Sequence, residues 1–177
     1  TRWVYREAKH LGLDPNSISV GGDSAGGNLA AATALELKNE FDLLSQILVY
    51  PALDLYSQYD SRTTNGSGYM LTTENMERFI GWYLNSESER QNWRASPLLA
   101  RVYDNLPPAI IISAEYDPLR DEAKVYADTL RNANVSVDYQ QFNGMIHGFV
   151  RMGAKVSIGI TALDYIAEKI NSHVEHR

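Results

Sequence analysis

The stretch Gly22-Asp23-Ser24-Ala25-Gly26 decides the fold predicted for this chain, because it has the pattern G-x-S-x-G. The run 18–21 before it can form a short buried strand, and the Ala- and Leu-rich run 27–39 after it favours a helix. A serine at a sharp turn between strand and helix exposes its hydroxyl above the sheet. We expect a side chain at position 22 or 26 to collide with this turn. Ser24 is therefore a candidate nucleophile, the alternative being a glycine-rich loop whose serine caps the helix.

A nucleophilic serine needs a base, and after such a turn the expected chain order is Ser, then Asp or Glu, then His. The sequence contains His10, His147, His173 and His176. His10 precedes the serine, and the last two lie in a polar tail. His147 follows the strand-like run 135–139, in the kind of loop where α/β sheets carry their working residues. We interpret His147 as the base, the alternative being a histidine fixed in its loop by hydrogen bonds alone.

The acid candidate is Asp117, which follows three consecutive isoleucines at 110–112. Such a run predicts a strand that is buried on both faces. An aspartate at its carboxyl end can orient the histidine ring and stabilise the imidazolium. The alternative is that Asp117 caps a helix that begins at Pro118. Asp54, which follows the strand-like run 47–50, is a second candidate for the acid.

Four stretches of the chain resemble, in this order, the hormone-sensitive-lipase-like esterases of the α/β-hydrolase fold: Gly21-Gly22-Asp23-Ser24-Ala25-Gly26-Gly27-Asn28, Ser96-Pro97-Leu98, Ala114-Glu115-Tyr116-Asp117-Pro118-Leu119-Arg120-Asp121-Glu122 and His147-Gly148-Phe149. The resemblance implies a partial α/β-hydrolase fold, with a mostly parallel sheet, helices on both faces and a partial cap. It implies that Ser24 is the nucleophile, Asp117 the acid and His147 the base. The implied activity is hydrolysis of carboxylic esters with short to medium acyl chains, without a metal or organic cofactor.

The chain departs from the family at the oxyanion site. The family has a His-Gly-Gly motif upstream of the nucleophile, whereas the 23 residues before Ser24 contain none. The amide of Ala25 can still donate one hydrogen bond to the oxyanion. We therefore expect residues 1–177 to be a single, truncated domain of a longer esterase. Each missing donor would lower its rate by about 10²–10³-fold.

The composition fits one globular domain. The chain has 177 residues, 44% of them hydrophobic and 21% charged, which argues against general disorder. A net charge of −6 argues against a nucleic-acid partner. There is no cysteine, no apolar stretch long enough to span a membrane and no H-E-x-x-H motif for a metal. The compartment stays open, with the cytoplasm favoured.

Helical and strand-like segments alternate, which predicts a parallel sheet covered on both faces. The expected helices are 2–11, 27–39, 73–84, 121–132 and 156–173, and the expected strands are 17–21, 46–50, 109–114 and 136–140. Residues 57–100 interrupt this alternation as a cap-type insertion, with a helix capped by residue 72 or 73. Its apolar residues could pack on the core, or the insertion could cover the site. In the second case Tyr69, Met70 and Phe149 would line a substrate pocket.

Two further expectations concern partners and other activities. If strand 17–21 lies at an exposed sheet edge, the chain is expected to self-associate through that edge. The partner of the site itself would be a small-molecule ester. A non-catalytic binding module on the same fold and a hydrolase of amides or thioesters remain alternative functions.

Overall fold

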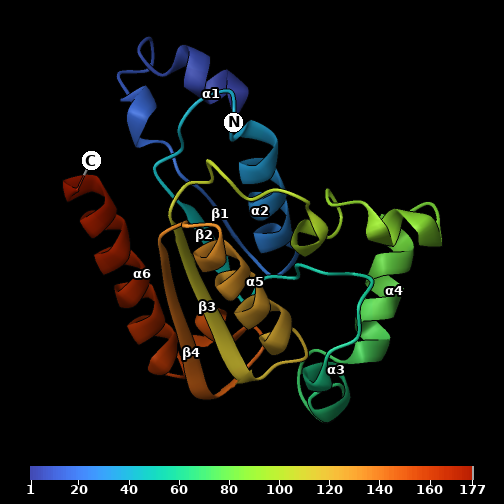
Figure 1. The fold of residues 1–177 in the computed structure, drawn as a ribbon. Coiled ribbons are helices and arrows are strands. Elements are labelled where there is room, and N and C mark those ends of the chain that lie inside the picture. Colours follow the sequence, from blue (N-terminus) through green and yellow to red (C-terminus); the bar gives the residue numbers. More distant parts are fainter. Residues whose placement is uncertain (177) are drawn as a thin grey trace.

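The computed structural model describes residues 1–176 and contains one sheet of four parallel strands (Figure 1). The strands are β1 (Val20–Asp23), β2 (Gln46–Val49), β3 (Ala109–Tyr116) and β4 (Val137–Ile146), and they lie side by side in chain order. Every neighbouring pair is parallel, so all four carboxyl ends lie at one end of the sheet. The predicted fold class is therefore confirmed.

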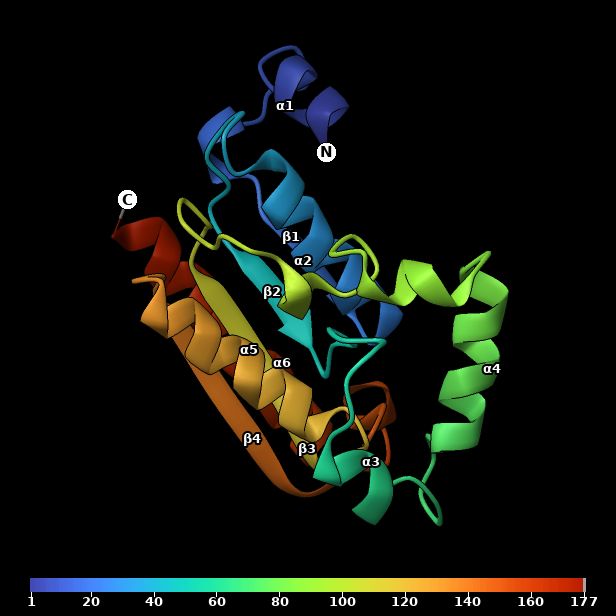
Figure 2. The same cartoon turned by 45° about the vertical axis from the view of Figure 1, so that its right-hand side comes forward.

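Helices cover both faces of the sheet (Figures 1 and 2). Helices α2 (Ala25–Leu37) and α5 (Arg120–Asn132) pack on one face, and α6 (Ile158–Glu175) packs on the other. Within residues 1–176, no helix combines the length and the apolar character that crossing a bilayer requires.

The isoleucine run in β3 forms the centre of the core. Ile110, Ile111 and Ile112 are all 0% exposed. Because side chains alternate along a strand, Ile111 packs in the cluster formed with α2 and α5, whereas Ile110 and Ile112 pack in the cluster formed with α6. The prediction that this strand is buried on both faces is confirmed.

The first helix ends earlier than the sequence predicts. Helix α1 (Arg2–Glu7) stops four residues short of the expected end at residue 11. Gly12 adopts a left-handed conformation with φ 71°, and the amide of Leu13 bonds back to the carbonyl of Ala8 at 2.8 Å. A glycine in this conformation closes the turn near residue 11, where the helix was expected to end, but residues 8–12 form turns rather than regular helix.

Strands β3 and β4 continue past their predicted ends at residues 114 and 140 because their pairing continues. An irregularity between Ala114 and Tyr116 shifts the register, and Tyr116 then pairs with Ile146. Residues 117 and 147 therefore leave the sheet side by side.

Segment 57–100 leaves the sheet after β2 and returns before β3. It contains the short helix α3 (Asp60–Thr64), the helix α4 (Thr73–Tyr83) and the 3₁₀ turns η2 (Glu87–Gln91) and η3 (Pro97–Leu99). In both views α4 stands away from the sheet and its covering helices (Figures 1 and 2). This segment is the part of the chain that interrupts the regular alternation of strand and helix.

Helix α4 is amphipathic, but only part of its apolar face is covered. The side chain of Thr72 caps its start, as the sequence predicts. Met76 and Ile80 are buried, whereas Phe79 and Tyr83 are 52% and 54% exposed. Part of the apolar face therefore lies open rather than packed on the core.

Candidate active site

Ser24 lies between β1 and α2, at the carboxyl end of the sheet. Its backbone has φ 56° and ψ −118°, a combination that residues with a side chain seldom adopt. Two bonds across the sheet end hold it there: the Ser24 amide donates to Val49 O at 2.9 Å, and the Ala52 amide donates to Ser24 O at 3.2 Å. The Ser24 side chain makes no cap bond to α2, so the alternative in which this serine serves only to cap the helix is wrong.

The glycines around the serine have unequal roles. A Cβ atom on Gly22 would lie 2.4 Å from the carbonyl carbon of Gly26, so the expected collision at position 22 is confirmed. The expected collision at position 26 is wrong, since a Cβ on Gly26 would have its nearest neighbour at 4.0 Å. Only a Cβ on Gly22 would point at the backbone on the other side of the turn, whereas a Cβ on Gly26 would point away from it. A Cβ atom on Gly27 would lie 2.7 Å from the Pro51 side chain, so this position is also closed to a larger residue.

His147 and Asp117 meet because β3 and β4 end in register. The His147 Nδ1 atom lies 2.7 Å from Asp117 Oδ2, and its Nε2 atom lies 3.0 Å from Ser24 Oγ. The Asp117 residue is 0% exposed, and its second oxygen accepts a bond from the Leu119 amide at 2.9 Å. Asp117 therefore contacts the histidine and accepts one bond in the turn before α5 (Arg120–Asn132). The alternative that Asp117 caps a helix beginning at Pro118 is wrong, because α5 begins at Arg120 with Leu119 as its N-cap.

The two bonds join three side chains in a line. An imidazole that donates through Nδ1 to a carboxylate has Nε2 free to accept the serine proton. The buried carboxylate fixes the ring tautomer and would stabilise the positive charge that the ring gains. The arrangement is thus chemically able to activate the Ser24 hydroxyl as a nucleophile.

Asp54, the second candidate for the acid, is occupied within its own turn. Its carboxylate accepts bonds from the amides of Tyr56 and Ser57 at 2.9 Å each and from the Tyr59 hydroxyl at 2.8 Å. Burial raises the pKa of Asp54, but these hydrogen bonds outweigh burial and leave it below its usual value. The structure therefore gives Asp54 the role of closing the chain turn after β2.

A cavity of about 640 Å³ opens at Ser24 and His147. Its wall is mostly apolar, and much of it comes from segment 57–100, with Leu119 and Arg151 on the other side. The residues that segment contributes are Met70, Leu71, Asn75, Met76, Phe79, Ile80 and Tyr83. An apolar hollow with a few polar groups at one end is typical of a small-molecule site.

The three residues expected to line a substrate pocket lie in different places. Met70 is in the cavity wall. Tyr69 is outside that wall and stacks on Tyr116, with ring centroids 5.2 Å apart. Phe149 is 1% exposed and packs with Phe142 in the core cluster on the α6 side of the sheet, so it does not line the cavity.

A buried ion pair beside the site was not anticipated. Glu122 is 0% exposed and accepts bonds from Arg62 at 2.6 Å and from the amides of Leu53 and Asp54 at 2.6 and 3.2 Å. Burial raises the pKa of Glu122 to about 7, although Arg62 and the two amides act in the opposite direction. Arg62 and Glu122 are 60 residues apart in the chain, so the sequence alone does not indicate that they pair. Its only indication is that Glu122 belongs to one of the stretches that resemble the esterase family.

A second unanticipated ion pair lies directly beside the nucleophile. Arg151 lines the cavity and lies 2.6 Å from the carboxylate of Asp23, the residue before Ser24. The only sequence signal is the spacing of four residues between His147 and Arg151. The pair ties the loop that carries the histidine to the turn that carries the serine.

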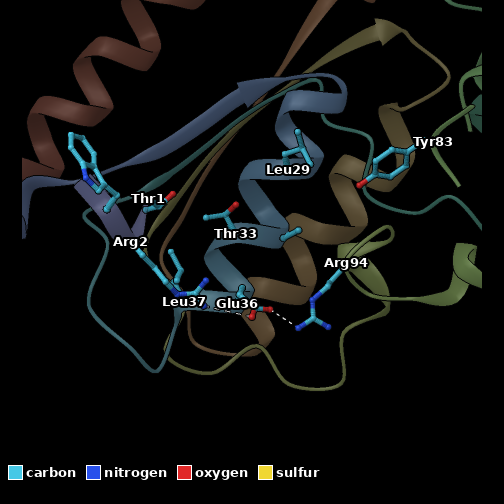
Figure 3. Close-up of a pocket in the computed structure, with 10 residues that line it drawn as sticks. Thr1, Arg2, Leu29, Thr33, Glu36, Leu37, Tyr83 and Arg94 are labelled. Atoms are coloured by element: carbon cyan, nitrogen blue, oxygen red, sulfur yellow. Dashed lines mark hydrogen bonds and ion pairs between the residues drawn. The ribbon is translucent and has the colours of Figure 1, made fainter. Parts of the chain in front are cut away.

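A separate hollow of about 550 Å³ lies over α2, next to the start of the chain (Figure 3). Glu36 at its floor pairs with Arg94 at 2.7 Å and with Arg2 at 3.6 Å, so the charges there are compensated. The described residues that line it include no histidine. It lacks the base that nucleophilic chemistry requires.

Comparison with known proteins finds relatives over nearly the whole chain. A family described as having the alpha/beta hydrolase fold matches residues 1–151. The chain is 35% identical to an ethyl acetate hydrolase from Pseudomonas putida over 98% of its own length and 55% of that protein. It is 36% identical to an arylesterase from Saccharolobus solfataricus, over 91% of this chain and 54% of that one.

Comparison with solved structures also finds similar proteins over nearly the whole chain. An esterase from Pyrobaculum calidifontis superposes with a TM-score of 0.93 at 39% identity, covering 98% of this chain and 58% of that one. The chain spans about half the length of the curated relatives it matches.

Proposed function

Since the chain belongs to the hormone-sensitive-lipase-like esterases of the α/β-hydrolase fold, we propose that it hydrolyses carboxylic esters through Ser24, His147 and Asp117. The observation that carries this proposal is the unbroken line of hydrogen bonds of 3.0 and 2.7 Å through the imidazole. The esterase names of its relatives support the reaction class. The roles of the three residues rest on the geometry.

In the proposed acylation step, His147 Nε2 removes the proton from Ser24 as its Oγ attacks the ester carbonyl. Asp117 holds the ring in place and stabilises the imidazolium. The Ala25 amide begins α2, and the first amides of a helix have no partner within it. Ala25 also lines the cavity, which supports its role as a donor to the oxyanion.

The tetrahedral intermediate then collapses. His147 returns its proton to the leaving alcohol, and an acyl ester forms on Ser24. In the second half, His147 removes a proton from water, which attacks the acyl carbonyl. The acid is released, and the proton returns to Ser24.

We propose that the substrates have short to medium acyl chains and that segment 57–100 acts as a cap. The segment supplies much of the apolar wall of the cavity, including Met70, Met76 and Ile80. A volume of about 640 Å³ is in the range of small-molecule sites. An apolar wall binds the acyl or alcohol group by burying it from water.

The proposal is tested by covalent labelling of the serine. We expect a p-nitrophenyl phosphonate to add one phosphonyl group to Ser24 and to release one equivalent of nitrophenol. Intact-mass analysis measures the adduct, and Ser24→Ala is the control that should take up none. A correctly folded chain that remains unlabelled would overturn the proposal and favour a non-catalytic binding module.

Hydrolysis of p-nitrophenyl esters of increasing acyl length then tests the substrate class. We expect kcat/KM to be highest between acetate and octanoate and to fall for longer chains. A rate that keeps rising with chain length beyond octanoate would contradict the short-to-medium assignment.

A further inference from the structure

Tyr50 has a backbone conformation that is unusual for a bulky residue. It follows β2 directly and has φ 36°, in the left-handed region. Such a conformation is unfavourable for a residue with a side chain and persists only where the surroundings impose it. Here the Tyr50 amide donates to Ile112 O at 2.7 Å, which fixes it to β3.

The strained backbone places the Tyr50 side chain against the histidine of the site. The centroids of the Tyr50 and His147 rings are 4.8 Å apart, with an interplanar angle of 57°. Phe149 packs against the same tyrosine at 5.9 Å, and Tyr50 is 1% exposed. The buried Tyr50 ring is thus packed between His147 and Phe149.

We propose that Tyr50 is a positioning residue for His147, whose ring holds the imidazole in line with Ser24 and Asp117 and stabilises its protonated form. The inference rests on the proposed function in one respect: His147 must take up a proton during the reaction. The contact itself does not depend on the activity.

The physical basis is the attraction between a cation and an aromatic ring. This attraction is appreciable when the cation lies within about 6 Å of the ring centroid, and it is stronger where water is excluded. In the proposed acylation step His147 gains a positive charge when it takes up the serine proton. An interaction that strengthens with this charge favours the transition state over the ground state.

Other charged groups also act around this contact. Asp117 faces Nδ1 of His147 from the end of β3, and Ser24 faces Nε2. The charges on Asp23, Arg151 and Asp117 act on the Tyr50 hydroxyl end of the ring. A test must therefore change the Tyr50 ring while these groups stay in place.

The Tyr50 hydroxyl allows the ring to be separated from the phenol oxygen. Among residues 1–176 the buried Tyr50 hydroxyl makes no hydrogen bond of normal geometry, although the nearby Asp23 carboxylate helps to raise its pKa. Removing a buried hydroxyl that lacks a partner costs little. Tyr50→Phe should therefore keep the effect on His147, whereas Tyr50→Leu should lose it.

The experiment is an NMR titration of the His147 imidazole in the chain as it exists. We expect Tyr50→Leu to weaken proton binding at His147 by about three- to tenfold, because the ring contact with the imidazolium is lost. Tyr50→Phe should stay within about twofold of the unmodified chain. Either an unchanged midpoint in Tyr50→Leu or an equal loss in Tyr50→Phe would overturn the proposal.

A second series keeps the shape of the ring, in case Tyr50→Leu does not fold. Phenylalanines that carry one, two or three ring fluorines replace Tyr50, and each fluorine weakens the negative face of the ring. Proton binding at His147 should weaken stepwise along the series. A flat series would overturn the role of the ring.

Tyr126 provides the matched control. It is 0% exposed, and its hydroxyl also lacks a hydrogen-bond partner, but it packs in the core cluster between α2 and α5. Tyr126→Leu should lower the free energy of unfolding without moving the His147 midpoint. Because the titration needs no turnover, it stays informative even if phosphonate labelling of Ser24 fails, so the two proposals can fail separately.

Discussion

At the scale of single residues, a substitution of Asp117 tests whether this residue is the acid that orients His147. Asp117→Asn keeps the shape of the side chain but replaces the carboxylate that accepts the hydrogen bond from His147 Nδ1 with an amide. The wrong tautomer of His147 then faces Ser24, and we expect kcat to fall about 10⁴-fold, as in serine proteases with the same change. Initial rates with a p-nitrophenyl ester measure the effect.

Asp54→Asn is the control for that prediction, because Asp54 is the other aspartate that the sequence offers as an acid. Its carboxylate is bonded within its own turn, so its loss should not change the rate per folded molecule. A large fall in kcat for Asp54→Asn together with a small one for Asp117→Asn would reverse the assignment of the acid.

The buried ion pair makes a prediction about stability. Arg62→Met would leave the Glu122 carboxylate buried without its cation, although two backbone amides still bond to it. Breaking such a pair costs about 3–5 kcal/mol of unfolding free energy, whereas replacing both partners with apolar residues is often neutral. Urea denaturation of Arg62→Met and of Arg62→Met with Glu122→Met measures this difference. Equal losses in both variants would contradict the interpretation.

Glu122 also predicts how stability depends on pH. Its pKa is raised from 4.5 to about 7 in the folded chain, so between these values the folded state binds more protons than the unfolded state. The contribution of this group is fully present below about pH 4.5 and is lost as the pH rises through 7. We expect Glu122→Gln to remove this decline, measured by urea denaturation at pH 5, 6, 7 and 8. An unchanged pH profile would contradict the raised value.

At the scale of elements, the position of the loop 66–72 is set by hydrogen bonds at its two ends. The Asn65 side chain donates to Glu115 O at 3.1 Å and to Asp117 O at 3.3 Å. The Thr73 amide closes the loop by donating to Gly66 O at 2.9 Å. The loop that carries Met70 is thus tied to the backbone of the acid residue.

Gly66→Ala tests whether these hydrogen bonds hold the loop in place. A Cβ at this position would lie 2.1 Å from Arg62 O and 2.3 Å from Thr73 Oγ1, so the backbone has to move. We expect a loss of about 1–3 kcal/mol in unfolding free energy and a raised KM, because the Met70 wall shifts. Gly81→Ala on α4 is the control: nothing lies within 4 Å of its Cβ, and it should stabilise the chain by about 0.5–1 kcal/mol. A Gly66→Ala variant as stable as Gly81→Ala would contradict this account.

Much of this element pattern could be predicted from the sequence, and the exceptions have physical causes. Strands β2 and β3 were found because residues 47–50 and 110–112 are apolar runs. Strand β1 is Val20–Asp23 rather than the expected 17–21, because the 3₁₀ turn Pro15–Ser17 occupies the start of that range. The end of β4 was missed because residues 141–146 are polar enough to resemble a loop, and only pairing with β3 keeps them extended. Ser24, Asp117 and His147 could be named from motif and order, but their distances depend on that pairing.

At the scale of the whole molecule, β1 is an edge strand of the sheet, and large apolar side chains lie exposed on α1, α2 and α4. Trp3, Leu29 and Trp82 are 59%, 55% and 75% exposed. Unpaired strand edges and exposed apolar patches both promote association. We expect this chain to self-associate through the β1 edge, giving a mass in light scattering that rises with concentration. A monomer at every concentration would contradict this prediction.

The shifted pairing of Tyr116 with Ile146 has a consequence for changes in chain length. Side chains alternate between the two faces of a strand, so deleting one residue inside β4 would turn His147 toward the opposite side of the sheet. Adding residues to the turn between α5 and β4 would leave that count intact. Tolerance to insertions and deletions should therefore differ sharply between positions only a few residues apart. A deletion inside β4 should separate His147 from Ser24 and Asp117, whereas an insertion in the turn before β4 should leave the three residues together.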